Sequence, residues 1–438
     1  MVNSIIKAST ARVALLISLY FPPEPGGGSM AAWNRATILH MIGYKVYVIC
    51  GFPSYPTGKV SDTKYKGKLI HIEKEGNFNL IRLRLLPLES KGYFRRFILF
   101  INFIFLMLIC IPKILRIPTR IELVYAMAPI LFSSFIGFLY SKLTKSFFIY
   151  EASALWPEEL VAFKTRLYSI ISIIGKVLAK VSYSLPDMIV LISNMAAEHV
   201  TKNYKPRVSV YALPIGVDPS KFPSVSMESC RQKLIGEKIF PDLVYDKFIV
   251  LYAGIISKVT RIENLVYAAN KLKDDVKDIV IIIVGNGEQR KQLEKIKSHH
   301  KIENLFFIPF QPGEIVPYII AAADVCVVSL SSEFIYDATV PTKFFDYLAC
   351  NKPIIGICKG EVAKIIESNT IGYVVKDGDV DNLAKVILSM KNSPATVRSM
   401  QINSQKVLKD FTLSNLALNF DKALKNEIMK KRNRTNVS

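Results

Sequence analysis

Short apolar runs alternate with helical patterns along this 438-residue chain, and they do so in two series. The first series begins with VALLISL, continues through KVYVIC, IELVYAM and SFFIYEA, and ends with DMIVLIS. The second begins with FIVLYAG at 248–254, continues through VIIIVG, LFFIPF and VCVVSL, and ends with PIIGIC. Apolar runs separated by helices indicate parallel sheets that are covered on both faces. The sequence therefore predicts an α/β protein with two Rossmann-like, doubly wound parallel-sheet domains.

A chain of this length exceeds what one hydrophobic core usually supports, so two domains are also the expectation from size. The segment LPIGVDPSKFPSVS, at 213–226, is rich in Pro, Gly and Ser and is typical of a linker. We expect the first domain at 1–218, the second at 219–407, and a C-terminal helix with a basic tail at 408–438.

The formal net charge of +21 predicts a polyanionic neighbour, which could be nucleic acid, an anionic membrane surface or a phosphorylated substrate. Nucleic acid is disfavoured because the positive charge is not interleaved with a nucleic-acid-binding motif. The six cysteines are scattered without C-x-x-C spacing, which indicates reduced thiols in a cytosolic protein and no zinc site. The early run VALLISLYF precedes PPEPGGG rather than a small-residue cleavage site, so we expect a first strand rather than a signal peptide.

The segment RRFILFINFIFLMLICIPK is the most apolar part of the chain. Its uncharged residues, 97–112, lie between the pair Arg95–Arg96 and Lys113. As a helix they would extend about 24 Å, short of the roughly 30 Å hydrocarbon core of a bilayer. Two interpretations remain, a helix at the membrane surface with its basic ends at anionic headgroups and a buried core helix. Nearby basic residues favour the membrane surface.

Glycines and charges gather in the loops that follow the predicted strands, where ligands of open parallel sheets bind. The residues concerned are Gly26 and Gly27 after the first strand, Gly254, Lys258 and Arg261 after FIVLYAG, Gly285, Asn286, Gly287 and Glu288 after VIIIVG, and Thr342 and Lys343 in the fourth such loop. Neither series has G-x-G-x-x-G at its first turn, and no Walker A motif occurs. Together these loops predict a cleft with a basic floor that suits a diphosphate.

Lys343 occupies an unusual position for a lysine. A helix that begins near Thr342 presents unpaired N–H groups and the positive end of its dipole, which favour an anion. A phosphate there would be held by the N–H groups and the ammonium together. The alternative is a surface ion pair with Asp346, which lies three residues further on the same helix face.

Several segments resemble glycosyltransferase family 4, and most closely its bacterial branch that builds O-antigen, capsule and exopolysaccharide repeat units. They are YFPPEPGGGSMAAWNRATILHMIGYKVYVICGFPSYPTGK, LWPEE, PIGVD, YAGIISK, VGNGEQRKQLE and PTKFFDYLACNKPII. The resemblance implies a GT-B architecture, in which the two domains face each other across a cleft and the C-terminal helix crosses back to the first domain.

The same resemblance implies a retaining transferase that uses no metal and no cofactor. Its donor would be a nucleotide sugar, a UDP-sugar, held mainly by the second domain. Its acceptor would be a polyprenyl-diphosphate-linked saccharide held by the first domain. The protein would then lie in the cytoplasm, peripherally attached to the inner face of the plasma membrane.

The family's site residues map onto this sequence position by position. Asp346 matches the acidic residue that binds the donor ribose, which leaves Thr342 and Lys343 to meet the diphosphate. Lys258 matches the basic residue that neutralises the leaving nucleotide, with Arg261 assisting. Gly26 and Gly27 match the glycine pair that closes over the phosphates.

The sequence departs from the family pattern in two places. Many members carry a glutamate eight residues before the position of Asp346, where this chain has Ala338. The exopolysaccharide branch often has an aspartate two residues before the tryptophan, where this chain has Ala154 before Trp156. Either Glu151 or Glu158 would supply that missing carboxylate. Trp156 is expected to pack or to line the acceptor entrance, and Arg95 and Arg96 to meet the membrane.

Asp377-Gly378-Asp379 resembles a D-x-D metal motif, but it directly precedes an amphipathic helix, where aspartate is a turn and N-cap residue. We therefore expect a cap and no metal. Two other functions remain open from the sequence. A nucleotide-sugar epimerase can share this fold, and a degenerate transferase acting as a scaffold would explain the missing glutamate.

Overall fold

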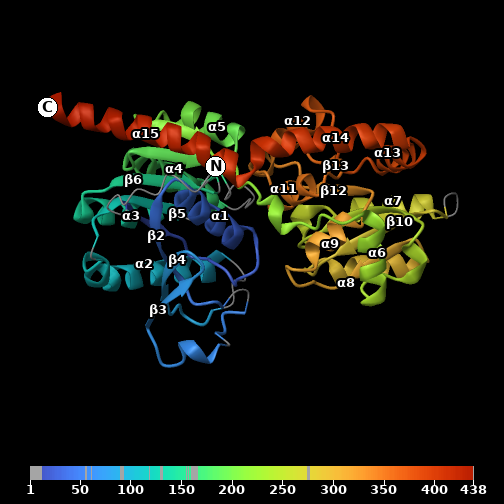
Figure 1. Cartoon of the computed structure of the whole chain (residues 1–438), viewed down its shortest axis with the longest axis horizontal. Helices are drawn as coiled ribbons and strands as arrows, with labels where there is room; N and C mark the ends of the chain where they lie inside the picture. Colours follow the sequence, from blue (N-terminus) through green and yellow to red (C-terminus); the bar gives the residue numbers. More distant parts are fainter. Residues whose placement is uncertain are drawn as a thin grey trace. The chain divides into compact units, whose positions relative to one another are not determined.

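The computed structural model of the chain describes residues 12–437 except 55–56, 61, 89–92, 118, 129–131, 154, 156, 159–165 and 274–276. The chain divides into two compact units, which are described here one at a time. Unit 1 comprises the residues up to Ile215 together with those from Leu413 onward, and unit 2 comprises Gly216–Thr412. Figure 1 shows the elements of both units with their labels.

An eight-stranded sheet forms the centre of unit 1 within the described residues, in the order β3-β4-β2-β1-β5-β6-β7-β8. Its strands are β1 (Arg12–Ile17), β2 (Tyr44–Gly51), β3 (Ile70–Glu75), β4 (Phe78–Leu83), β5 (Ile121–Ala128), β6 (Phe147–Ala152), β7 (Met188–Leu191) and β8 (Ser209–Ala212). Neighbouring strands are parallel except β3 and β4, which pair antiparallel. The central strands are fully buried, which explains why their sequences are continuously apolar.

Helices cover both faces of this sheet. They are α1 (Gly27–Met41), α2 (Tyr93–Leu115), α3 (Phe132–Thr144), α4 (Arg166–Ser184), α5 (Asn194–Tyr204) and α15 (Leu413–Val437). The connections through α2, α3 and α4 all advance toward β8, whereas the connection through α1 runs toward β3. Because such crossovers are right-handed, α2, α3 and α4 cover one face and α1 covers the other. The C-terminal helix α15 packs beside α1.

Unit 2 contains a six-stranded parallel sheet in the order β11-β10-β9-β12-β13-β14. Its strands are β9 (Phe248–Ala253), β10 (Ile279–Val284), β11 (Leu305–Ile308), β12 (Val325–Ser329), β13 (Ile354–Ile357) and β14 (Gly372–Val375). Its helices are α6 (Met227–Gly236), α7 (Glu263–Leu272), α8 (Arg290–His299), α9 (Val316–Ala321), α10 (Phe334–Asp337), α11 (Thr342–Ala349), α12 (Gly360–Ser368), α13 (Val380–Asn392) and α14 (Pro394–Phe411). This strand order is that of the Rossmann fold.

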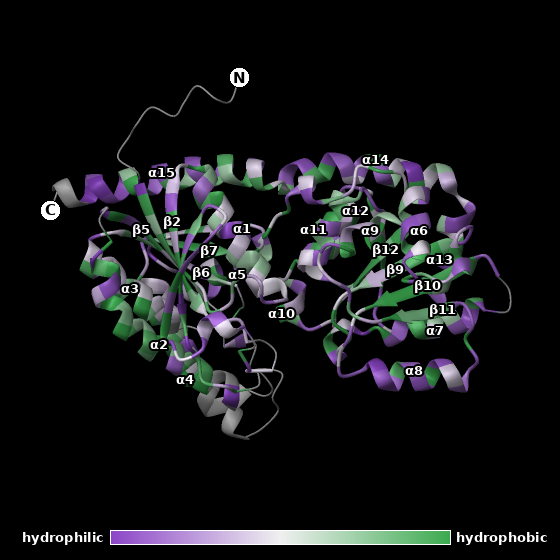
Figure 2. Cartoon of the chain, turned by 60° about the horizontal axis from the view of Figure 1, so that its bottom comes forward, coloured by the Kyte–Doolittle hydropathy of each residue, from purple (hydrophilic) through white to green (hydrophobic). Residues whose placement is uncertain are grey.

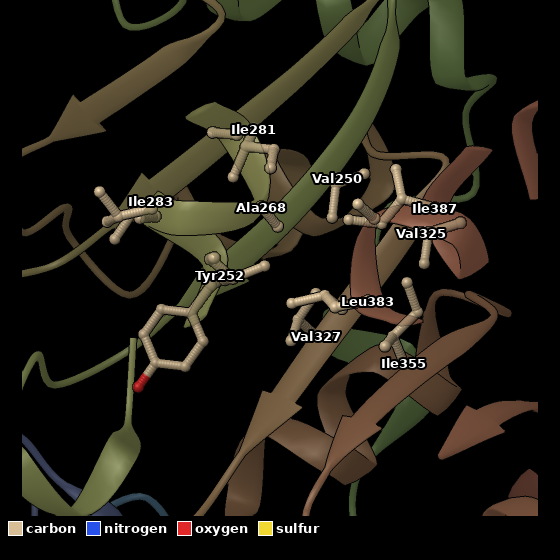
Figure 3. Close-up of a cluster of buried hydrophobic side chains, with 14 of the residues drawn as sticks. Val250, Tyr252, Ala268, Ile281, Ile283, Val325, Val327, Ile355, Leu383 and Ile387 are labelled. Carbon is tan, nitrogen blue, oxygen red and sulfur yellow. The ribbon is translucent and has the colours of Figure 1, made fainter. Parts of the chain in front are cut away.

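The core of unit 2 is built mainly from β-branched and leucine side chains. Val250, Ile281 and Val325 come from neighbouring strands, and Leu383 and Ile387 from α13 pack over them (Figure 3). Tyr252 belongs to the same cluster, but its hydroxyl points away from the aliphatic side chains. The core therefore ends on a polar group at the carboxyl end of β9.

The predicted α/β architecture with two parallel sheets is confirmed, with local differences. The hairpin of β3 and β4 was not predicted, because β3 alternates apolar and charged residues at a sheet edge. The unit boundaries lie after Ile215 and after Thr412, a few residues from the expected positions. The segment expected at 97–112 belongs to a longer helix, α2, which has 23 residues.

α2 has one buried side and one exposed apolar side, so the buried-helix interpretation is confirmed for one side and the membrane-surface interpretation stays a prediction. Leu99, Phe103 and Met107 on one side are buried, whereas Phe105 and Leu108 are 60% and 42% exposed. By length and composition, Ile98–Leu115 is the one described segment that could cross a membrane, with a mean hydropathy of 2.6. Its length is no obstacle, because 23 helical residues extend about 35 Å. One side of α2 nevertheless belongs to the core of unit 1.

Candidate functional site

The carboxyl ends of β9, β10 and β12 define the candidate site of unit 2. β9 lies between β10 and β12, and the chain proceeds outward in both directions from β9 and β12. This reversal of strand order is the position at which open α/β sheets bind ligands. The loops that follow these strands contain most of the residues that the sequence analysis selected.

Lys343 lies in the first turn of α11 and reaches across to β9. Its ammonium donates a hydrogen bond to the hydroxyl of Tyr252, with a nitrogen–oxygen distance of 2.6 Å. The same ammonium lies 3.9 Å from the centroid of the Tyr252 ring. A Cβ added at Gly254 would lie 2.5 Å from the Lys343 nitrogen, so the absence of a side chain at Gly254 gives the ammonium its room.

The backbone at the start of α11 leaves donors available. Pro341 is the N-cap residue and provides no side-chain hydrogen bond to the first turn. Phe344 donates its N–H to the Pro341 carbonyl, and the first turn contains no acidic residue. The helix start therefore combines dipole, backbone N–H groups and an ammonium, which together suit an anion.

Asp346 lies on the next turn of α11, and its carboxylate forms no hydrogen bond or ion pair to a side chain within the described part of the chain. Burial raises the pKa of Asp346 to about 7, although the charges of Lys343 and Lys221 act in the opposite direction. Burial likewise lowers the pKa of Lys343 to about 7. Two opposite charges thus lie in a poorly hydrated place without neutralising each other fully, which is typical of a ligand site.

The glycine-rich loops after β9 and β10 pack directly against each other. A Cβ added at Gly285 would lie 1.9 Å from the Gly254 carbonyl oxygen, and one at Gly287 would lie 2.0 Å from the Ile256 carbonyl oxygen. Backbone hydrogen bonds join the same loops, from Gly254 to Val284 and from Ile256 to Asn286. These glycines therefore allow the two loops to form one continuous surface.

Lys258 and Glu288 meet at the edge of that surface. The backbone N–H of Lys258 lies 3.4 Å from a carboxylate oxygen of Glu288, while the Lys258 side chain is exposed. The Lys258 ammonium forms no ion pair with a described residue. Asn286 is exposed and accepts a hydrogen bond from Arg290. Lys258 is thus an available cation beside the switch point.

Arg261 was expected to assist Lys258, and the structure gives its guanidinium two carboxylate partners. Its guanidinium is paired with Asp377 at 3.0 Å and with Glu263 at 3.1 Å. Arg261 also adopts a left-handed backbone conformation, with φ of 46°. Through its pair with Asp377, Arg261 joins the loop after β9 to the loop after β14. Its role at the diphosphate stays a prediction.

Glu151, expected to be catalytic, lies in the interior of unit 1. Its carboxylate is fully buried at the end of β6, where it accepts hydrogen bonds from Arg35 at 2.7 Å and from the Tyr125 hydroxyl at 2.5 Å. Arg35 in turn donates to the carbonyls of Leu213 and Pro214. Glu151 is therefore a buried structural partner of Arg35 in this structure.

The other carboxylate considered, Glu158, lies in a polar cluster of unit 1. One of its oxygens accepts hydrogen bonds from the Tyr204 hydroxyl at 2.8 Å and lies 2.9 Å from His199. Burial alone would raise the pKa of Glu158, but the hydrogen bond from His199 and other hydrogen bonds outweigh this effect, so the pKa of Glu158 is lowered. Trp156, the predicted acceptor residue, lies outside the described residues.

Two remaining groups of predicted residues lie in unit 1. Gly26 is the N-cap residue of α1 with φ of 114°, and Gly27 begins the helix. No side chain caps the N-terminus of α1. The first turn of this helix therefore also presents backbone N–H groups that could bind an anion. Arg95 is exposed on α2, and Arg96 follows it in the same helix.

The D-x-D sequence is a helix cap, as expected. Asp379 accepts a hydrogen bond from the backbone N–H of Asn382 at the start of α13, and Asp377 pairs with Arg261. Within the described ranges no group of three or more His, Cys, Asp or Glu side chains is arranged to hold a metal ion.

Sequence reasoning missed the two tyrosines that organise the site. Tyr252 holds Lys343, and the Tyr347 hydroxyl accepts a hydrogen bond from the Ala253 backbone at 3.1 Å. A tyrosine inside the otherwise aliphatic run FIVLYA was a usable signal, because a buried hydroxyl needs a partner. Its partner could not be identified from sequence spacing.

Comparison with known proteins gives this site a context. Residues 237–407 match the family described as glycosyl transferases group 1, which is less than half of the chain. WcaI of Escherichia coli (strain K12), provisionally named a colanic acid biosynthesis glycosyl transferase, is 32% identical over 108 residues, 25% of this chain and 26% of WcaI. An uncharacterized glycosyltransferase of Methanocaldococcus jannaschii is 21% identical over 59% of this chain and 63% of its own. The chain thus spans less than two thirds of these relatives.

Solved structures match over nearly the whole chain. Sucrose-phosphate synthase from Thermosynechococcus elongatus gives a TM-score of 0.74 at 17% identity, covering 96% of this chain and 100% of that one. HepE of Anabaena, in complex with UDP-glucose, gives a TM-score of 0.65 at 15% identity, covering 95% of this chain and 100% of HepE. WaaG, a glycosyltransferase involved in lipopolysaccharide biosynthesis, gives a TM-score of 0.64 at 14% identity, covering 94% of this chain and 99% of WaaG. The two units therefore have the GT-B fold, and unit 2 carries a glycosyl transferases group 1 domain.

Proposed function

We propose that this protein is a retaining glycosyltransferase that moves a sugar from a nucleotide sugar, a UDP-sugar, to a polyprenyl-diphosphate-linked saccharide. We further propose that the protein acts in bacterial surface polysaccharide biosynthesis, at the cytoplasmic face of the plasma membrane. The glycosyl transferases group 1 domain supports the reaction class. The similarity to WcaI and to WaaG supports the polysaccharide, and the UDP-glucose bound to HepE supports the donor.

One observation carries the proposal. At the switch point of unit 2, the start of α11 brings together an ammonium, backbone donors without a side-chain cap, and a carboxylate on the next turn. A nucleoside diphosphate has the complementary groups, since its phosphates are anionic and its ribose carries two hydroxyls. Lys343 and the N–H groups at Thr342 and Lys343 would hold the diphosphate, and Asp346 would accept hydrogen bonds from the ribose.

The proposed chemistry needs a cation at the departing diphosphate. When the bond between the anomeric carbon and the donor oxygen breaks, negative charge grows on the diphosphate. Preorganised cations and N–H groups then stabilise the transition state more than the ground state. Lys258 is exposed beside the switch point and is our candidate for this role, with Lys343 holding the phosphates. The chemistry proposed here involves neither a metal nor a cofactor.

A transfer assay tests the proposal. The purified full-length protein is incubated in detergent with each of a panel of UDP-sugars and with a polyprenyl-diphosphate-linked saccharide, and products are identified by mass. We expect one donor to give a glycolipid that is one sugar longer, with the anomeric configuration of the donor retained in its NMR spectrum. Lys258→Ala should abolish most transfer, whereas Lys291→Ala, an exposed lysine on α8, should not.

The same assay separates the competing functions. An epimerase would convert the donor sugar into its epimer without any acceptor. A scaffold would neither bind UDP nor release it from any donor. Hydrolysis alone with every acceptor, or conversion without an acceptor, would refute the proposed transfer.

A further inference from the structure

The outer face of α2, α3 and α4 has an unusual composition. These helices contain 23, 13 and 19 residues and not one Asp or Glu. At the frequency of acidic residues in the whole chain, about four or five would be expected. The three helices do contain lysines and arginines, so the face is selectively depleted of negative charge.

The same face exposes large apolar side chains. The exposed residues are Ile101, Phe105, Leu108 and Ile109 on α2, Leu139 and Leu143 on α3, and Ile173, Ile174, Val177 and Val181 on α4. Their exposed fractions range from 36% to 65%. A few scattered apolar residues are normal on any surface, whereas large exposed apolar side chains gathered on one layer of helices indicate an interaction site.

These side chains share one surface because the three helices share one layer. α3 packs beside α2 and beside α4, and the Tyr140 hydroxyl of α3 donates a 2.7 Å hydrogen bond to the Met107 carbonyl of α2. All three helices cover the same face of the sheet, so the sides turned away from the sheet form a single outer face. Figure 2 shows long hydrophobic stretches along α2, α3 and α4.

Basic side chains accompany this apolar face. The exposed ones are Lys113, Arg116, Lys142, Lys145, Lys176 and Lys180. None of them forms an ion pair with any residue that the structure describes. Lys176 and Lys180 lie on α4 between the exposed residues Ile173, Val177 and Val181. Apolar side chains interleaved with cations are complementary to a bilayer surface that contains anionic headgroups.

We infer that the outer face of α2, α3 and α4 docks unit 1 onto an anionic lipid bilayer. The inference deepens the proposed function and rests on it, because a transferase can reach a lipid-linked acceptor only at a membrane. α2 lies along the bilayer and does not cross it, because Met107 and Cys110 on its other side are fully buried in unit 1. A second copy of the chain is a poor occupant, since a two-fold contact would place basic, acid-free faces against each other.

Vesicle binding tests the docking surface without donor or acceptor. The full-length protein is sedimented with phosphatidylcholine vesicles that contain or lack phosphatidylglycerol. We expect binding only with phosphatidylglycerol, and weaker binding at high salt. Because each basic residue near such a surface contributes about a factor of five to binding, Lys176→Gln with Lys180→Gln should weaken it about 25-fold. Phe105→Gln with Ile173→Gln should weaken it at least tenfold.

Matched controls lie on α14 of unit 2, where Lys406, Lys409 and Ile402 are also exposed on a helix. Lys406→Gln with Lys409→Gln, and Ile402→Gln, should bind vesicles as the unaltered protein does. Equal binding to both vesicle types, an equal loss in the controls, or a dimer that Phe105→Gln dissociates would overturn the inference. Transfer in detergent without vesicle binding would refute the docking surface alone, and vesicle binding without transfer would refute only the proposed function.

Discussion

The ammonium of Lys343 lies 2.6 Å from the hydroxyl of Tyr252, although the two residues are 91 positions apart in the sequence. The Tyr252 hydroxyl in turn donates a hydrogen bond to the Ile255 carbonyl oxygen, which lies 2.7 Å away. The tyrosine thus holds the lysine over Gly254 in a defined position. No described carboxylate lies within ion-pair distance of Lys343, so its charge is positioned but not neutralised.

The first prediction concerns Glu151. Glu151→Gln should lower the free energy of unfolding by about 3–5 kcal/mol, because it leaves the buried Arg35 guanidinium without its anion. The protein that remains folded should keep its kcat. Urea unfolding and steady-state kinetics at low temperature measure the two quantities. A large loss of kcat with unchanged stability would mean that Glu151 contacts substrate after all.

The second prediction concerns the glycines of unit 2. Gly285→Ala should lower stability by about 3 kcal/mol or more, because its Cβ would overlap the Gly254 carbonyl oxygen at 1.9 Å and its φ is 138°. Gly313→Ala is the matched control, since a Cβ there meets nothing within 4 Å. Thermal unfolding of both variants checks the prediction, and equal melting temperatures would contradict the packing of these two loops.

The third prediction compares two cations in one loop. Lys258→Ala should lower kcat at least 100-fold without changing stability, because the side chain is exposed and would act on the leaving diphosphate. Arg261→Ala should instead lower stability by about 0.5–1 kcal/mol, since its pairs with Asp377 and Glu263 are partly exposed. Kinetics and urea unfolding of the two variants should give opposite patterns. A large loss of kcat in Arg261→Ala, with unchanged kcat in Lys258→Ala, would instead place Arg261 at the diphosphate.

The fourth prediction concerns pH. Burial raises the pKa of Asp346 to about 7 from an ordinary value near 4, so the folded protein keeps a proton that the unfolded chain releases. Its contribution to stability is therefore present at pH 4 and is lost as the pH rises to 7. The effect of Lys343 lies above pH 7, because its pKa is lowered to about 7 from an ordinary value near 10. Asp346→Asn should flatten the melting temperature between pH 4 and 7; an unchanged slope would contradict the burial of this carboxylate.

The fold was largely predictable because buried parallel strands are continuously apolar. β9, β10 and β12 were located correctly for this reason, and Lys343 stood out because a lysine at a helix start opposes the helix dipole. The sequence did not indicate which distant residues would meet. Glu151 was considered as a substitute for the family carboxylate that is missing at Ala154, but Arg35 from α1, 116 residues away, forms an ion pair with it.

The apolar segment 97–112 shows the same limit. Composition located 97–112 correctly but could not separate its buried side from its exposed side, since both are apolar. α3 and α4 drew no attention because each alone is an ordinary amphipathic helix. Only the sheet order places them beside α2 and makes one surface of the three.

The most direct test of the account measures UDP binding to Lys343→Met, a change that keeps most of the apolar stem and removes the charge. Isothermal titration calorimetry should give a dissociation constant about 10- to 100-fold higher than that of the unaltered protein, the loss of one charge-assisted contact to a diphosphate of about 1–3 kcal/mol. The melting temperature without ligand should stay unchanged or rise, because a half-buried ammonium without an anion costs stability. An unchanged dissociation constant together with a lower melting temperature would contradict the account and make Lys343 a structural residue.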